Sequence, residues 1–98
     1  MIYVLIHHEV ADYPVWKSVL DSSLDWRSRN GEHSCRIFRG VENPNDLTLL
    51  FEWENLEKAR AFIASDELKH RMAKAGVKGV PQVEYLTEMF SIRRSAAD

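Results

Sequence analysis

The pattern of apolar and polar residues begins with a short apolar segment. Ile, Val, Leu and Tyr occupy both alternating faces of residues 2–10. This composition is typical of a β-strand, and a strand that is apolar on both sides must be covered on both sides. We therefore predict a strand over Ile2–Val10.

From residue 12 onward the apolar positions follow the spacing of a helix. Asp12 is a suitable N-cap, and Pro14 falls in the first turn, where its missing N–H is harmless. The helix is predicted to end near Asn30-Gly31, because glycine favours the left-handed conformation found at helix ends. One face has the i, i+3, i+4, i+7 spacing and is expected to pack on a sheet. It consists of Trp16, Val19, Leu20, Ser23, Leu24 and Arg27.

The second half of the chain repeats the order of strand and helix. Two strands are predicted at His33–Val41 and Leu47–Glu54, with turn residues at 42–46 between them. Two helical pieces should follow: Leu56–Ala64, capped by Asn55, and a second piece that is capped by Ser65 and ends at Gly76. Gly79 and Pro81 are expected to interrupt the chain before a last strand at Gln82–Ile92.

The predicted order β-α-β-β-α-β indicates an α+β fold of the ferredoxin-like type. Right-handed crossovers place the helices on one face of a four-stranded antiparallel sheet, as a sandwich. We expect one domain over residues 1–94 and a frayed tail at 95–98. The other sheet face still carries apolar side chains, so we expect a homodimer in which two sheets pack face to face.

Composition and charge exclude several classes of function. Thirteen Lys and Arg against fifteen Asp and Glu give a net charge of −2, with no basic face for nucleic acid. The apolar start spans only residues 1–6, whereas a membrane helix needs ~20 apolar residues. Cys35 is the only cysteine, so neither an internal disulfide nor a structural zinc site is expected. No metal or cofactor is required by any motif, and a cytoplasmic setting is expected.

Several short motifs resemble those of a known family. They are His8-x-Val10-x-Asp12-Tyr13-x-x-Trp16-Lys17, Phe38-Arg39 before Asn43-Pro44-Asn45, Phe51-Glu52-Trp53, Lys58-Ala59-Arg60-Ala61-Phe62, Ser65-Asp66-Glu67-Leu68, Lys74-Ala75-Gly76-Val77 and Pro81. Together they resemble the antibiotic biosynthesis monooxygenase-like group of the dimeric α+β barrel superfamily, over residues 2–90. The resemblance implies a pocket between sheet and helices in each protomer. Members oxidise polyketide phenols or quinols without metal or flavin, or degrade haem.

Neither catalytic pattern of the family is complete in this chain. The haem-degrading branch has Asn, Trp and His at positions that align with His7, Phe62 and Met72, and His70 lies two residues from the ligand position. The quinol-oxidising branch often has His at the positions of Phe62 and Glu67. The resemblance therefore implies the fold and the dimer more specifically than the chemistry.

His7 is the candidate catalytic base. His7 and His8 are neighbours on a strand, so they point to opposite faces and only one can face the pocket. A neutral imidazole in a dry pocket can take a phenolic proton. The alternative is that both histidines only form hydrogen bonds at the end of the strand.

Four further residues are candidates for contact with a flat aromatic ligand: Trp53, Phe62, Trp16 and Arg27. The aromatic rings could stack on such a ligand, and Arg27 could reach an anionic group. The alternatives are that the rings are core residues and that Arg27 extends to water. Two functions follow: a cofactor-independent monooxygenase for a polyketide phenol or quinol, and a non-catalytic small-molecule-binding or stress-associated homodimer.

Overall fold

Four strands and four helices make up the fold over residues 1–94. The computed structural model describes residues 1–94, and the tail expected at residues 95–98 lies outside the described residues. The strands are β1 (Ile2–Val10), β2 (Glu32–Arg39), β3 (Asp46–Trp53) and β4 (Val77–Leu86). The helices are α1 (Tyr13–Ser22), α2 (Leu24–Asn30), α3 (Leu56–Ile63) and α4 (Asp66–Lys74).

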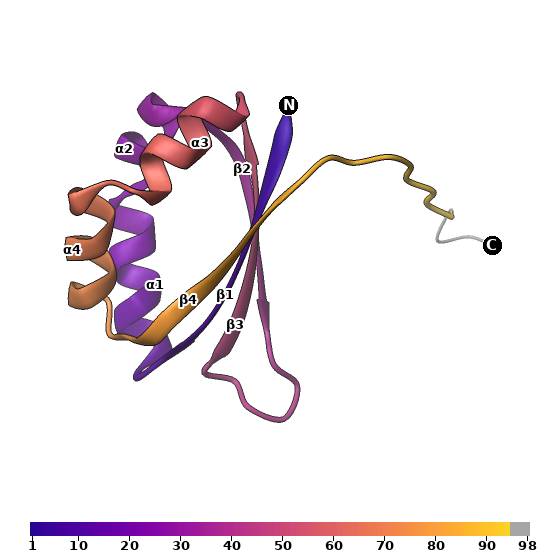
Figure 1. Ribbon diagram of the computed structural model, residues 1–98. Helices are drawn as coiled ribbons and strands as arrows, with labels where there is room; N and C mark the ends of the chain where they lie inside the picture. Colours follow the sequence, from indigo (N-terminus) through magenta and orange to yellow (C-terminus); the bar gives the residue numbers. More distant parts are fainter. Residues whose placement is uncertain (95–98) are drawn as a thin grey trace.

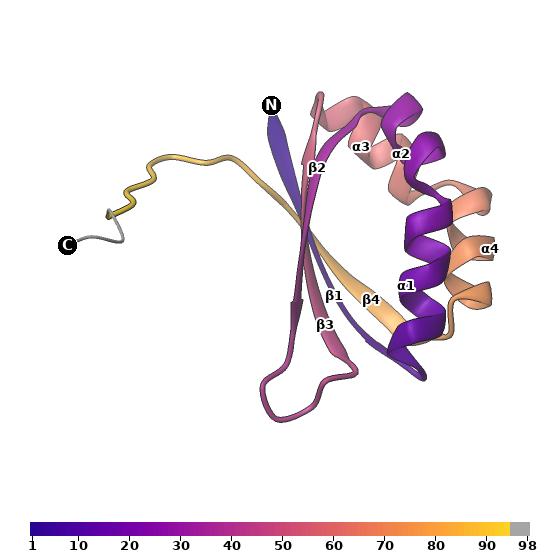
Figure 2. The same cartoon turned by 180° about the vertical axis from the view of Figure 1, so that it is seen from behind.

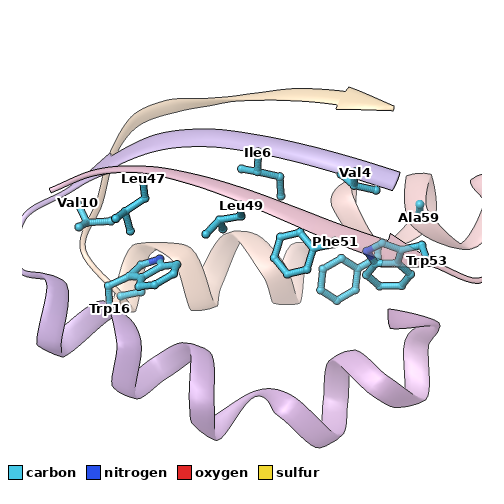
Figure 3. Close-up of a cluster of buried hydrophobic side chains, with 11 residues drawn as sticks. Val4, Ile6, Val10, Trp16, Leu47, Leu49, Phe51, Trp53 and Ala59 are labelled. Atoms are coloured by element: carbon cyan, nitrogen blue, oxygen red, sulfur yellow. The ribbon is translucent and has the colours of Figure 1, made fainter. Parts of the chain in front are cut away.

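The strands form one antiparallel sheet in the order β2-β3-β1-β4, and all four helices lie on one face of it (Figure 1). The view from behind shows that no helix or strand of residues 1–94 covers the other face (Figure 2). This topology confirms the predicted ferredoxin-like α+β sandwich. The core lies between sheet and helices, with Trp16 near one end and Phe51 and Trp53 near the other (Figure 3).

The predicted caps of α1, α3 and α4 are confirmed. The side chains of Asp12, Asn55 and Ser65 each accept a hydrogen bond from the backbone amide three residues further on. Each bond satisfies one of the backbone donors that the first turn of a helix leaves without a partner. These caps fix where the helices begin and therefore which of their faces meets the sheet.

The prediction of one continuous helix over residues 12–31 is wrong at Ser23, where α1 ends and α2 begins. The hydroxyls of Ser22 and Ser23 both donate to the carbonyl of Val19, at 3.0 and 2.7 Å. Such bonds compete with the helical ladder. Beyond the break Leu24 is 53% exposed although its spacing placed it on the buried face, while Trp26 is half-buried and Arg27 stays buried.

The last strand also differs from the prediction, because β4 spans Val77–Leu86 and not Gln82–Ile92. Val77 pairs with Val10 of β1, so pairing starts before Gly79. Gly79, with φ of 69°, lies in a bulge where the register shifts, and the strand continues beyond it. Leu86 pairs with Tyr3 near the start of β1, so residues further along have almost no partner strand within the chain.

The uncovered face of the sheet is partly apolar. Leu5 and Leu50 are direct neighbours at its centre, and Phe38 and Leu86 lie further out, 47% and 40% exposed. The segment after β4 extends away from the body of the chain (Figures 1 and 2). It carries three strongly exposed apolar side chains, Met89, Phe90 and Ile92. We call Leu5, Leu50, Phe38 and Leu86 the open-face patch.

Candidate functional site

A small cavity of about 60 Å³ lies between the sheet and the helices. Both layers line it, with residues from β1, β3 and β4 on one side and from all four helices on the other. Its aromatic residues are Trp16, Trp26, Phe51 and Phe62. Its polar residues are His8, Ser23, Arg27 and Arg71. The cavity therefore combines aromatic walls with a few polar groups, which is the usual make-up of a ligand site.

Three of the five predicted site residues, Trp16, Phe62 and Arg27, line this cavity. Trp53 does not: it is 1% exposed and packs in the core, with its ring centroid 4.6 Å from that of Phe62. The backbone of Gly31, with φ of 123°, lies against the Trp53 indole, and a Cβ there would come within 3.0 Å of the ring. Trp53 thus supports Phe62 from behind and does not reach the cavity.

The structure places His7 away from the cavity. Alternate residues of β1 face the helices, and the buried set contains His8 but not His7. The His7 side chain lies on the uncovered sheet face, 43% exposed, with its Nε2 atom 2.7 Å from Oδ1 of Asp46. The expectation that His7 is the pocket base is therefore wrong in its placement, and the histidine that lines the cavity is His8.

His8 is a buried imidazole without a hydrogen bond. The residue is only 6% exposed, and neither ring nitrogen has a hydrogen-bond partner within residues 1–94. Burial, with a smaller contribution from the charge of His7, lowers the pKa of His8 to about 4. At neutral pH the ring is therefore uncharged, and one of its nitrogens is a proton acceptor. Buried polar groups are rarely left unpaired, so this ring is the strongest indication of a ligand.

Arg27 is buried beside the cavity, which contradicts the alternative that it extends to water. It is 6% exposed. Its Nε donates to Oε1 of Glu32 at 2.8 Å, and Nη1 donates to the carbonyl of Leu20. Burial raises the pKa of Glu32, and the charge of Arg27 opposes that rise. The guanidinium is thus held in place by two elements, α1 and β2, while it borders the cavity.

Arg71 and Trp26 are cavity residues that the sequence reasoning missed. Nη1 of Arg71 donates to Oγ of Ser23 at 2.8 Å, and Nε donates to Oε1 of Glu67 at 2.8 Å. Its guanidinium carbon lies 4.2 Å from the centroid of the Trp26 ring, within the range of a cation–π contact. The one available signal was that Arg71 follows Leu68 by three positions on α4, next to its buried face.

Other reactive side chains offer no second site. Burial raises the pKa of Cys35 to about 11, so the thiol is protonated and weakly nucleophilic at neutral pH. His70 is exposed on α4, as expected, while Met72 lines the cavity. Within the part of the chain that the structure describes, no three His, Cys, Asp or Glu side chains are grouped for a metal ion. None of the helices over residues 1–94 has the length and apolar character needed to cross a membrane.

Comparison with solved structures finds the same fold in several proteins. One from Bordetella bronchiseptica, provisionally assigned as an antibiotic biosynthesis monooxygenase, has a TM-score of 0.76 and 18% identity, covering 91% of this chain and 97% of its own. A second such protein, from Caulobacter crescentus, has a TM-score of 0.70 and 19% identity, covering 91% and 90%. SnoaB, a cofactor-independent oxygenase from Streptomyces nogalater, has a TM-score of 0.68 and 13% identity, covering 99% and 97%.

These structures confirm the resemblance at the level of the fold. No protein-family sequence model matches the chain, and no curated protein matches it in sequence. Identities below 20% do not carry catalytic residues from one chain to another. The chemistry of this chain therefore depends on the residues of its own cavity.

Proposed function

We propose that this protein is a cofactor-independent monooxygenase that acts on a flat aromatic phenol or quinol of the polyketide type. The observation that carries the proposal is His8, a neutral and unpaired imidazole in an aromatic cavity. The likeness of fold to SnoaB, a cofactor-independent oxygenase, supports it. Trp16 and Phe62 would contact the ring system of the substrate, and Arg27 would favour a negative charge on it.

The chemistry needs only binding, orientation and removal of a proton. For an anthrone, His8 takes the proton of the enol form, and the resulting anion gives an electron to O₂. The ring CH₂ becomes a carbonyl with one oxygen atom of O₂, and the other oxygen atom leaves as water with the two hydrogens. The charges of the buried Arg27 and the partly exposed Arg71 beside the cavity favour the anion in this step.

The size of the cavity supports a second candidate function, a homodimer that binds a small molecule without chemistry. An apolar cavity of about 150 Å³ holds a benzene ring, and the present cavity of about 60 Å³ is smaller. A substrate ring therefore requires movement of the cavity walls. If the walls open only for a small ligand, the protein binds it and does not oxidise polycyclic phenols.

We also propose that the active form is a homodimer. The open-face patch and the exposed side chains of Met89, Phe90 and Ile92 leave much apolar surface in water. A second copy with the same patch would cover it by two-fold symmetry. The cavity lies on the other face of the sheet, so each protomer would carry its own site.

Oxygen uptake with a panel of hydroquinones and anthrones tests the function. We expect wild-type protein to consume O₂ above the background rate, and His8→Gln to lower kcat by about 10²-fold or more, the usual contribution of a general base. His7→Gln is the matched control on the other face of the strand and should keep the wild-type rate. No uptake above background, or an unchanged rate for His8→Gln, would show that the protein is not this enzyme.

A further inference from the structure

A surface groove of about 320 Å³ lies behind the wall of the cavity. It is formed by α2, α3 and the start of α4, and its lining includes Arg29, Lys58 and Glu67. Trp26 and Phe62 line both the groove and the inner cavity. The two spaces are therefore the outer and inner sides of one pair of aromatic rings.

The wall between groove and cavity includes a ring contact and an ion pair, and Arg71 of the pair also lies over the Trp26 ring. The rings of Trp26 and Phe62 lie with centroids 4.7 Å apart and planes tilted by 41°. Next to them, the ion pair of Arg71 and Glu67 joins the two spaces, since Arg71 lines the cavity and Glu67 lines the groove. We call Trp26, Phe62, Glu67 and Arg71 the partition.

The partition has one part that is held weakly. The Glu67 side chain is 51% exposed, and ion pairs in such a setting contribute little to stability. An anion in the groove would compete with Glu67 for the same guanidinium. Phe62, by contrast, is 7% exposed and rests on Trp53, so it is the fixed side of the partition.

The charges around the groove favour a negative ligand. Lys58 is paired with Glu54, and Arg71 is paired with Glu67. Arg29, however, has no ion pair or side-chain hydrogen bond with any residue in the range 1–94. The groove thus has one cation without an acidic partner, Arg29, and its Glu67 is paired with a cation of the cavity, Arg71.

We propose that groove and cavity are two ends of one binding site, and that its ligand is an aromatic ring that carries a carboxylate. The ring contacts Trp26 and Phe62 and extends toward the cavity, while the carboxylate replaces Glu67 on Arg71 and lies near Arg29. Trp26 moves outward to admit the ring, because its other face borders the open groove. The inference rests on the proposed function in taking the cavity as its ligand site, and it adds the acidic substituent and the route of access.

Titration calorimetry at low ionic strength tests the proposal with two probes of equal ring size, naphthalene-2-carboxylate and neutral 2-naphthalenemethanol. We expect one carboxylate per chain, bound at least ten times more tightly than the alcohol. Arg71→Gln should remove this difference. Glu67→Gln should tighten binding of the carboxylate several-fold, because the guanidinium loses its competitor. Lys69→Gln, an exposed cation on the same helix, should behave as wild type.

Equal affinity for the two probes, or no binding of the carboxylate, would overturn the proposal. Arg71→Gln also removes the bond to Ser23, so its fold is checked by circular dichroism. If that variant is unfolded, Glu67→Gln and Arg29→Gln decide, and unchanged affinity in both contradicts the proposal. If the carboxylate binds but the hydroquinones and anthrones give no O₂ uptake, only the oxygenase function is overturned. O₂ consumption without preference for the carboxylate would overturn this inference alone.

Discussion

The rings of His8 and Trp16 meet edge to face beneath the sheet, with centroids 5.9 Å apart and planes at 73°. Trp16 therefore covers one side of the imidazole with an apolar surface. The ring nitrogens of His8 form no hydrogen bond to it. A protonated His8 in this place would be a buried charge without a partner. The contact therefore connects the packing of α1 on β1 to the protonation state of the site.

The pH dependence of stability follows from His8. Its pKa is about 4 in the folded chain and 6.5 in the unfolded chain, so the unfolded state binds more protons between these values. Stability should fall as pH decreases from about 6.5 to about 4, by on the order of 3 kcal/mol from this group. Urea unfolding at a series of pH values measures it.

His8→Phe is the variant that isolates this effect, since it removes the titrating group and keeps an aromatic ring. The unfolding free energy of this variant should depend less on pH between about 4 and 6.5 than that of the wild type, because the contribution of His8 is absent. His7→Phe, on the uncovered face, should retain that slope. An identical slope in wild type and His8→Phe would mean that His8 titrates normally.

The buried ion pair of Arg27 and Glu32 should be strongly coupled. The two side chains are 8% and 4% exposed. Arg27→Leu should destabilise the protein by about 3–5 kcal/mol, because it leaves a buried carboxylate without its partner. The double variant with Glu32→Leu should cost less than Arg27→Leu alone. Denaturant unfolding gives the unfolding free energies of the wild type, Arg27→Leu and the double variant.

The exposed pair of Lys17 and Asp21 is the matched control for this cycle. Lys17→Ala should change the unfolding free energy by no more than about 1 kcal/mol, as is usual for surface ion pairs. If Arg27→Leu cost as little as Lys17→Ala, the pair beside the cavity would be no more than a surface contact.

The homodimer is tested by sedimentation at micromolar concentration. We expect a species of twice the chain mass of 11.4 kDa. Leu50→Arg should give monomers, because it places a charge at the centre of the open-face patch. Val41→Glu is the control, since this residue is fully exposed in the turn between β2 and β3. A stable wild-type monomer would be inconsistent with the proposed assembly.

The sequence predicted the fold well because capping, turn and periodicity signals agree with one another. Asp12, Asn55 and Ser65 cap helices as expected, and the apolar stripe of α1 brings Trp16 to the cavity. The start of β4 was harder to predict, because a bulge at Gly79 and an interruption of the chain have the same local sequence signal. Only pairing with β1, which is distant in sequence, separates them.

The candidate site was predicted in part, for two physical reasons. β1 is apolar on both faces, so alternation could not show whether His7 or His8 lies under the helices. In addition, the helix is divided at Ser23; in α2 Leu24 is exposed and Trp26 lines the cavity. The spacing of apolar residues shows neither which face of β1 meets the helices nor where hydrogen bonds of two serine hydroxyls interrupt a helix.

The most direct test of the central claim is nitrogen-15 NMR of the histidine rings with and without 2-naphthol. The chain has four histidines. In the ligand-free protein we predict that His8 stays neutral down to about pH 4. At neutral pH the phenol should shift the His8 ring nitrogens, while those of His7 and the exposed His33 and His70 stay unchanged. A His8 that titrates near pH 6.5, or that shows no response to the phenol, would contradict the account.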